Sequence, residues 1–350
     1  MALWQCEAVT ATRTTRKPRP PVMVDALVDD PEHIRELVRA NAPYWPVQRY
    51  INNSAEYAAL SGDRRAARGD TADSGQSDAM FVAPVFRGNW ALQGETLAGT
   101  SGEVGELLHH PLLVSAAAEL FDGAVVDPHT IYVNATWQLP FPQGRGHTDI
   151  PTFRGFDRTE HDIAFLTIMG LSGLFEDERV DVATAVAWFH LGPDGGFEYW
   201  PDGAEAPSVI HEGDIDNTAV VGDNDFMWHR VRPTGDPDKG LMGLSLDAEL
   251  HHVAGGTHPW EIRRGSEALA AFGDRELRIS LSWKADVYRS AAQRTRRHEH
   301  LDDLDMGTVV ERFREDLRRR GLRVELPADP EHDPESISLL AETYVTYPAG

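Results

Sequence analysis

Short apolar runs with a period of two residues dominate the middle of the chain. Glycine, proline and aspartate separate these runs, a pattern typical of strands joined by turns. No long helical pattern interrupts them before the 260s, so they favour an antiparallel sandwich or barrel over a parallel α/β sheet. The predicted strands are 130–139, 161–173, 180–192, 196–200, 217–221, 225–231 and 277–288.

Helical periodicity appears on both sides of this β-rich part. Ile34, Leu37 and Val38 are spaced i, i+3, i+4 after a Pro-Glu opening. Residues 103–123 are also helical in pattern, with a break at Pro111, and residues 309–321 place apolar side chains on one face before ending at a glycine. The predicted fold class is therefore mainly β with flanking helices.

These patterns divide the chain into four predicted parts. Residues 1–25 form a flexible basic arm, and 26–128 form a helical N-terminal portion with an exposed loop at 61–78. Residues 129–290 form the β core with an insertion at about 235–274, and 291–350 form a C-terminal helical segment.

Composition narrows the class of protein. The 350 residues are 41% hydrophobic and include 13 Phe and 9 Trp, enough for a sizeable core. A net charge of −23 disfavours nucleic acid and anionic membranes as partners. A single cysteine, Cys6, excludes an internal disulfide and a cysteine metal cluster, and no apolar run is long enough to span a membrane. We expect a cytoplasmic globular protein, and its oligomeric state stays open.

One short sequence carries the most specific chemistry. In GRGHTDIP, His147 and Asp149 are two residues apart, so in an extended segment both side chains point to the same side. His229 lies in a later apolar strand and supplies a third ligand. Two imidazoles and one carboxylate on one side of an ion are typical of non-heme Fe(II) oxygenases. We therefore predict a metal site at His147, Asp149 and His229.

With these residues in view, about residues 130 to 288 resemble the double-stranded β-helix (jelly-roll or cupin-like) core of the Fe(II)/2-oxoglutarate-dependent dioxygenases. GRGHTDIP resembles the first half of that family's HxD…H triad and FMWHRV the second. The resemblance implies Fe(II) and 2-oxoglutarate as cofactors and catalytic roles for the three ligands. It also implies a β-helix core packed by N- and C-terminal helices.

The family binds the distal carboxylate of 2-oxoglutarate with a basic residue on the last core strand. LRISLSWKADVY resembles that strand, so Arg278 with Ser280 is the predicted anchor, and a guanidinium suits a carboxylate because it donates two parallel hydrogen bonds. The usual spacing is about ten positions after the distal histidine, which Lys239 meets, whereas Arg278 comes about fifty positions after His229. Lys239 is therefore the rival anchor.

The resemblance implies an oxygenase that oxidises an unactivated C–H bond of a small, amino-acid-like or natural-product molecule. Hydroxylation is the default outcome, with desaturation or cyclisation as variants, while 2-oxoglutarate and O2 become succinate and CO2. Asn134 is a further candidate for 2-oxoglutarate, and the candidate substrate residues are Trp137, Arg145, Arg154 and Arg230. The alternatives are a 2-oxoglutarate-independent cupin-like metal oxidase and a non-catalytic β-sandwich binding protein.

Overall fold

The computed structural model describes residues 16–52, 82–99, 101–123, 125–141, 146–239 and 243–345. The predicted loop 61–78 and the first fifteen residues of the predicted arm lie outside this range. The chain divides into two compact units, of which residues 17–149 and 181–293 form the larger and 150–180 with 294–349 the main part of the smaller. Within the described residues, no helix is long and apolar enough to cross a membrane.

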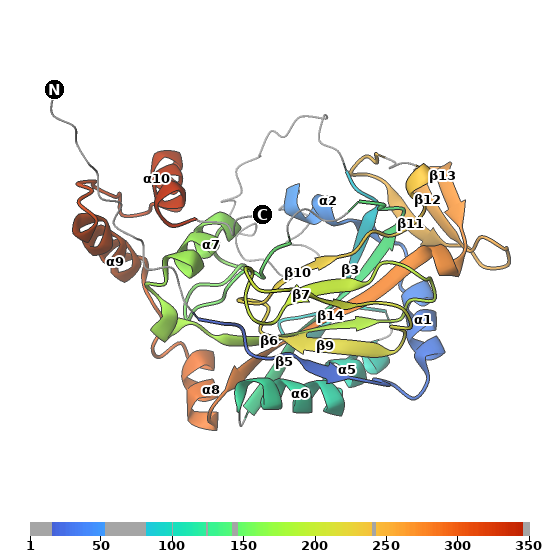
Figure 1. Cartoon of the computed structure of the whole chain (residues 1–350), viewed down its shortest axis with the longest axis horizontal. Coiled ribbons are helices and arrows are strands. Elements are labelled where there is room, and N and C mark those ends of the chain that lie inside the picture. Colours follow the sequence, from blue (N-terminus) through green and yellow to red (C-terminus); the bar gives the residue numbers. More distant parts are fainter. Residues whose placement is uncertain are drawn as a thin grey trace. The chain divides into compact units, whose positions relative to one another are not determined.

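An eight-stranded antiparallel sheet is the centre of the larger unit (Figure 1). Strand β14 lies in its middle and pairs with β5 on one side and β6 on the other. The strands along the sheet are, in order, β1 (Val22–Val24), β9 (Thr218–Gly222), β6 (Asp181–Trp188), β14 (Leu277–Tyr288), β5 (Val125–Trp137), β3 (Val85–Leu92) and β2 (Trp45–Pro46), with β4 (Glu95–Thr96) paired to β3.

A smaller sheet is formed by β10 (Trp228–Val231), β7 (Phe197–Trp200) and β8 (Val209–His211) in that order. The segment at His147 extends it through a bridge to His229. Along the chain the order is β5, the His147 segment, β6, β7, β8, β9, β10 and β14, and successive strands change sheet except β7 and β8, which pair within the small sheet. With the spatial orders β5-β14-β6-β9 and 147-β10-β7-β8, this is the double-stranded β-helix, so the predicted fold class is confirmed.

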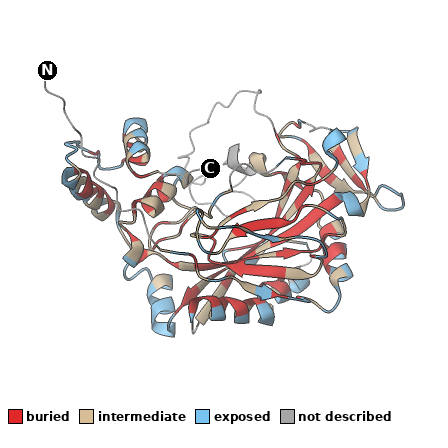
Figure 2. Cartoon of the chain, viewed as in Figure 1, coloured by how far each residue is buried: buried red, intermediate tan, exposed pale blue. Residues whose placement is uncertain are grey.

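The two faces of the large sheet have different partners because successive side chains on a strand point to opposite sides. Ile279, Leu281 and Trp283 of β14 join a core shared with helices α1 (Pro31–Ala40), α5 (Ser101–Leu108) and α6 (Pro111–Phe121). On the other face, Trp188 packs against Phe197 of the small sheet. Strands β6, β9 and β14 of the large sheet are largely buried (Figure 2), as is β7 of the small sheet, whereas β8 is not. The even-numbered side chains of β14 therefore point into the space between the two sheets.

The predicted insertion contains a separate three-stranded sheet. Its strands β11 (Glu249–His252), β12 (Trp260–Arg264) and β13 (Glu267–Phe272) form an antiparallel meander. Since this meander lies in the chain between β10 and β14, it accounts for the long spacing between His229 and Arg278.

Two details of the larger unit differ from the sequence prediction. The N-terminal portion 26–128 is not only helical, since β3 pairs with β5 within the large sheet. The end of the predicted flexible arm 1–25 is also ordered, since it contains β1, which pairs with β9. A short helix α2 (Val47–Asn52) follows β2. An edge strand of three residues such as β1 is too short to show a period of two in the sequence.

The smaller unit contains the helices α7 (Ile163–Ser172), α9 (Met306–Arg319) and α10 (Pro334–Tyr344). Helix α8 (Ala291–His298) begins in the last residues of the larger unit and ends in the smaller one. The prediction of a strand at 161–173 is wrong, because this segment is α7. Asp162 caps the helix by accepting from the backbone N–H of Ala164, and the apolar run is buried at the helical spacing Phe165, Ile168, Met169. A continuous apolar run does not distinguish a buried strand from a buried helix.

Candidate metal centre

Backbone hydrogen bonds bring the two predicted histidine ligands side by side. The N–H of His147 donates to the carbonyl of His229 at 3.0 Å, and the N–H of His229 donates back to His147 at 2.9 Å. Their rings lie 4.5 Å apart between centroids. Although 82 positions of sequence separate the pair, the β-helix makes them neighbours on adjacent strands.

Gly146 allows this close pairing. Its φ of +91° lies in the left-handed region, and a Cβ there would lie 2.9 Å from the carbonyl oxygen of His229. A side chain at this position would push apart the two segments that carry the histidines. The glycine of GRGHTD is therefore required by the site's geometry.

Replacing Gly146 with alanine is expected to lower the free energy of unfolding by about 1–3 kcal/mol and to weaken divalent-metal binding about tenfold. Urea unfolding and a Co(II) titration measure the two effects. Gly94→Ala is the matched control, since Gly94 has a similar φ of +81° but no atom within 4 Å of the added Cβ. Equal metal affinity in the two variants would contradict this role of Gly146.

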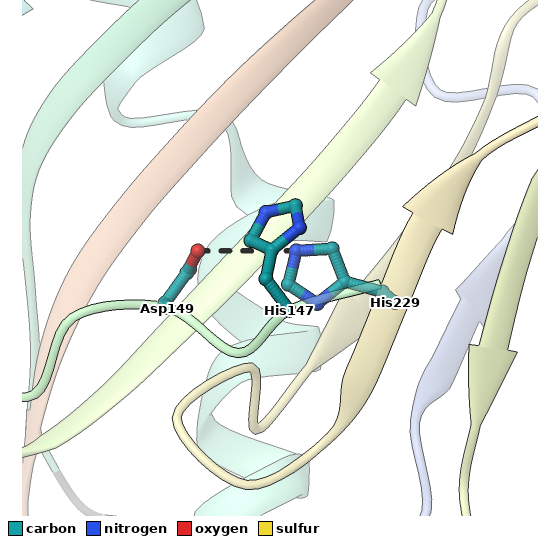
Figure 3. Close-up of side chains that lie close together, drawn as sticks. All are labelled: His147, Asp149 and His229. Carbon is teal, nitrogen blue, oxygen red and sulfur yellow. Dashed lines mark ion pairs between the residues drawn. The ribbon is translucent and has the colours of Figure 1, made fainter. Parts of the chain in front are cut away.

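Asp149 completes the group. One ligand atom from each of His147, Asp149 and His229 lies within 4.8 Å of the others, and Asp149 Oδ1 is 3.9 Å from His229 Nε2 (Figure 3). The backbone N–H of Asp149 donates to the carbonyl of Asn224 at 2.8 Å, which fixes the segment against the turn before β10. Two imidazoles and one carboxylate thus converge from two segments of the small sheet.

Neighbouring groups orient the ligands. His229 Nδ1 lies 2.9 Å from the Met227 carbonyl, so it donates its proton there and leaves Nε2 free to bind a metal. Asp149 Oδ2 accepts hydrogen bonds from Thr184 Oγ1, at 3.0 Å, and from Lys284 Nζ. The atoms turned toward the centre of the group are therefore the ones without a hydrogen-bond role elsewhere.

The electrostatics keep all three ligands in their metal-binding protonation states. Burial lowers the pKa of His147 to about 4, with help from nearby His229, and burial also lowers the pKa of His229. Burial alone would raise the pKa of Asp149, but the Lys284 ammonium outweighs it and holds that pKa well below its usual range. At neutral pH the site offers two neutral imidazoles and a carboxylate.

These shifts predict how metal binding depends on pH. A histidine that binds a metal must lose its proton, so a pKa of 6.5 would cost about tenfold in affinity for each histidine between pH 7.5 and 5.5. With the pKa values lowered, Co(II) affinity is expected to change less than about threefold over that range and to fall only toward pH 4. Calorimetric titrations at several pH values measure this. A drop of about a hundredfold by pH 5.5 would contradict the assignment.

Arg278 on β14 is a buried cation and forms a second candidate binding group. Its side chain is 1% exposed, its Nε donates to the carbonyl of Gly195 and its Nη1 donates to Ser280 Oγ at 3.0 Å. Its Nη2 is buried and has no hydrogen-bond partner among the described residues. Burial lowers the pKa of Arg278 to about 10, so it remains a cation at neutral pH. A buried guanidinium with an unpaired nitrogen suits an anionic ligand.

Lys239, the rival anchor, lies at the protein surface. The Lys239 side chain is 59% exposed and lies 3.7 Å from Glu276 in a surface ion pair. Surface pairs of this kind contribute little binding energy. The geometry therefore favours Arg278 with Ser280 over Lys239 as the carboxylate-binding group.

The predicted residues Asn134 and Trp137 both lie on β5 but point to opposite faces of the large sheet. Asn134 is on β5, where its side chain donates to Ser282 Oγ and accepts from Arg87 Nε at 3.0 Å. Trp137 stacks on Phe272 at 4.7 Å on the helix-facing side of the sheet, so its prediction as a pocket residue is wrong: it is an odd number of positions from Asn134 and points the other way.

Two of the predicted arginines, Arg154 and Arg230, form ion pairs or hydrogen bonds away from the triad. Arg230 pairs with Glu198 at 2.8 Å, on the face of β10 opposite to His229. Arg154 belongs to the smaller unit, where it donates to the carbonyls of Asp302 and Asp177. Arg145 lies outside the described residues.

Sequence reasoning missed Lys284, Thr184 and Arg87. Lys284 has the same strand parity as Arg278, and this was the signal for its inward direction. Thr184 lies directly opposite Lys284 on β6. Arg87 lies over the Tyr132 ring, 4.8 Å from its centroid, and its charge lowers the pKa of His147.

A second group of metal-ligand types occurs at Asp329, Glu331 and His332. Glu331 is already bound to His161, at 2.8 Å, and to the backbone N–H of Asp162. His332 pairs with Asp329 in an exposed turn. These local hydrogen bonds explain the cluster without an ion.

Comparison with known proteins gives likenesses in structure only. No family model matches the chain, and no curated protein matches it. An oxidoreductase of the 2OG-Fe(II) oxygenase family from Burkholderia pseudomallei is 11% identical, with 78% of this chain and 89% of that chain covered and a TM-score of 0.39. A prolyl-4-hydroxylase from Pseudomonas putida is 11% identical over 77% and 94% of the two chains, with a TM-score of 0.31.

A third similar structure is HygX from Streptomyces hygroscopicus with nickel and 2-oxoglutarate bound. It is 8% identical over 77% of this chain and 83% of that chain, with a TM-score of 0.34. At these TM-scores the likeness is loose, and the strand order of the chain itself defines its fold.

Proposed function

We propose that this protein is an Fe(II)- and 2-oxoglutarate-dependent oxygenase that acts on a small molecule. The observation that carries the proposal is a pair of features inside one β-helix: the converging ligand atoms of His147, Asp149 and His229, and the buried guanidinium of Arg278 with an unpaired nitrogen. Each feature fits one of the two cofactors.

The ligand set fits Fe(II). Two imidazole nitrogens and one carboxylate oxygen are the protein ligands of iron sites that keep positions open for other molecules. The hydrogen bond from His229 Nδ1 to Met227 and the two bonds to Asp149 Oδ2 hold the ligands in place before the ion binds. With both cofactors bound, the site would supply the activation of O2 that oxidises a C–H bond while 2-oxoglutarate becomes succinate and CO2.

The environment of Arg278 fits the distal carboxylate of 2-oxoglutarate. Arg278 has the same parity on β14 as Lys284, whose ammonium reaches Asp149, so both side chains point into the space between the sheets. Ser280 Oγ accepts from Arg278 Nη1, which orients the guanidinium. The role of these residues is to bind and orient an anion and to exclude water around it.

Arg87 is the candidate substrate contact, and it lies beside Asn134, the further candidate for 2-oxoglutarate. They hydrogen-bond each other on neighbouring strands β3 and β5, and Arg87 is close enough to influence His147 electrostatically. This pair suits a polar or acidic group on a small molecule, such as an amino-acid-like or natural-product substrate. Hydroxylation is the default reaction, with desaturation or cyclisation as variants.

The proposal is tested by supplying Fe(II), O2 and 2-oxoglutarate labelled at C1 and measuring labelled CO2 and succinate together. We expect equal amounts of both products, formed only with all three components, and none from His147→Ala. Substrate oxidation that needs no 2-oxoglutarate would instead indicate a metal oxidase. A protein that binds no metal would be the non-catalytic binding protein, and the proposal would be wrong.

A further inference from the structure

Lys284 and Thr184 form a clamp on one oxygen of the proposed metal ligand Asp149. Lys284 Nζ donates to Asp149 Oδ2 and to Thr184 Oγ1, the latter at 3.0 Å, and Thr184 Oγ1 donates to the same Asp149 oxygen. The three side chains thus close a triangle. Both donors point to Oδ2, and neither bonds Oδ1.

The large sheet makes this clamp rigid. Lys284 on β14 and Thr184 on β6 are direct register partners in neighbouring antiparallel strands. Opposite residues on one face of a sheet are held at a fixed short distance, so the two donors keep their spacing without help from the ligand segment. Asp149, by contrast, belongs to the segment after His147 that joins the small sheet. The clamp ties this segment to the large sheet.

Lys284 and Asp149 form an ion pair within the clamp. The Lys284 and Asp149 side chains are 18% and 19% exposed, so water screens the pair only in part. The Lys284 ammonium is therefore the charged partner that the structure places on Asp149 in metal-free protein.

We propose that Lys284, together with Thr184, is a positioning residue that makes Asp149 a one-oxygen metal ligand and supplies its counter-charge before the metal arrives. This inference rests on the proposed metal site. Because Oδ2 is taken by two donors, the carboxylate presents only Oδ1 toward His229 and occupies one metal position. More positions then remain for the other ligands of the ion.

Two substitutions separate the charge of Lys284 from its bulk. Lys284→Met removes the ammonium and both hydrogen bonds, and Lys284→Gln retains a donor without the charge. In both, metal-free protein keeps a buried carboxylate without its counter-ion, and Asp149 loses the charged donor that orients it. We expect the thermal midpoint of the metal-free form to fall by about 5 °C and Co(II) to bind roughly tenfold more weakly than to the wild type.

The visible absorption of bound Co(II) reports the geometry of the ligands. Freeing Asp149 Oδ2 allows it to bind as a second oxygen, so we expect the Co(II) bands of Lys284→Met to change in position and intensity. Lys284→Arg retains the charge and is expected to restore the stability and the affinity. Lys17→Met is the matched control, because Lys17 is an exposed lysine of the same unit, and it should match the wild type.

The possible results distinguish a failure of the Lys284 inference from a failure of the proposed metal site. If Lys284→Met and Lys284→Gln bind Co(II) with wild-type affinity and spectrum, the inference is overturned while the metal site stands. A loss of stability that is equal in the metal-free and Co(II)-loaded forms would also overturn it, because it would indicate a packing role only. If wild-type protein binds no Co(II), the proposed function itself fails. Should Lys284→Met not fold, Lys284→Gln gives the same decision.

Discussion

Replacing His229 with alanine is expected to abolish stoichiometric Fe(II) binding and, with it, succinate formation. His229 contributes one of three converging ligand atoms, and its ring is 6% exposed, so water does not replace the imidazole with the same geometry. Loss of an outer hydrogen-bond partner alone costs 10–100-fold in metal affinity. Loss of a ligand is therefore expected to cost about a hundredfold or more. Anaerobic equilibrium dialysis with Fe(II) measures it.

The matched control is His251→Ala. His251 lies on β11 of the separate meander and bonds Glu249 at 2.7 Å, so its removal should leave iron binding unchanged. Circular dichroism checks that both variants are folded. If His229→Ala retained iron at wild-type affinity, the triad would be a packing arrangement and the proposed function would be wrong.

Replacing Arg278 with methionine has the second-largest expected effect, on 2-oxoglutarate and not on iron. Methionine fills a similar volume but offers no donor to a carboxylate. Losing one partner of a buried charged hydrogen bond costs about 2–5 kcal/mol, so we expect the KM for 2-oxoglutarate to rise by roughly 30-fold or more. Fe(II) affinity should stay within about threefold of the wild type, since Arg278 is not among the ligands.

Two further variants, one at an arginine and one at a lysine, are compared with Arg278→Met. Arg264→Met removes an exposed arginine that pairs with Glu267 and should change nothing. Lys239→Met tests the rival anchor directly: its side chain is mostly exposed, so we expect an unchanged KM. A raised KM in Lys239→Met with a normal KM in Arg278→Met would reverse the assignment of the anchor.

The fold class and the triad were predictable because they depend on patterns local to short segments. The spacing of His147 and Asp149 defines their common direction, and the alternation around His229 places it on a strand. The position of Arg278 on a core strand was predictable from its strand pattern in spite of its unusual spacing after His229, which the meander β11–β13 explains.

The errors come from information that local patterns do not contain. The apolar run of α7 has only Thr167 and Ser172 as polar positions, too few to show its period, so its helical form follows from the Asp162 cap and from the partners it packs against. Lys284 was missed because a lysine on a strand is usually directed to solvent, and only the pairing of β14 with β6 brings it beside Asp149. Trp137 was placed on the wrong face although strand parity already contradicted that placement.

The central claim is that one site in this chain holds Fe(II) and 2-oxoglutarate together. An anaerobic titration of Fe(II)-loaded protein with 2-oxoglutarate tests it most directly, because chelation of the iron produces a visible charge-transfer band. We predict a band that saturates at one equivalent of 2-oxoglutarate per chain, requires higher concentrations in Arg278→Met and is absent from His229→Ala. Iron-loaded wild-type protein that develops no band at saturating 2-oxoglutarate would contradict the claim.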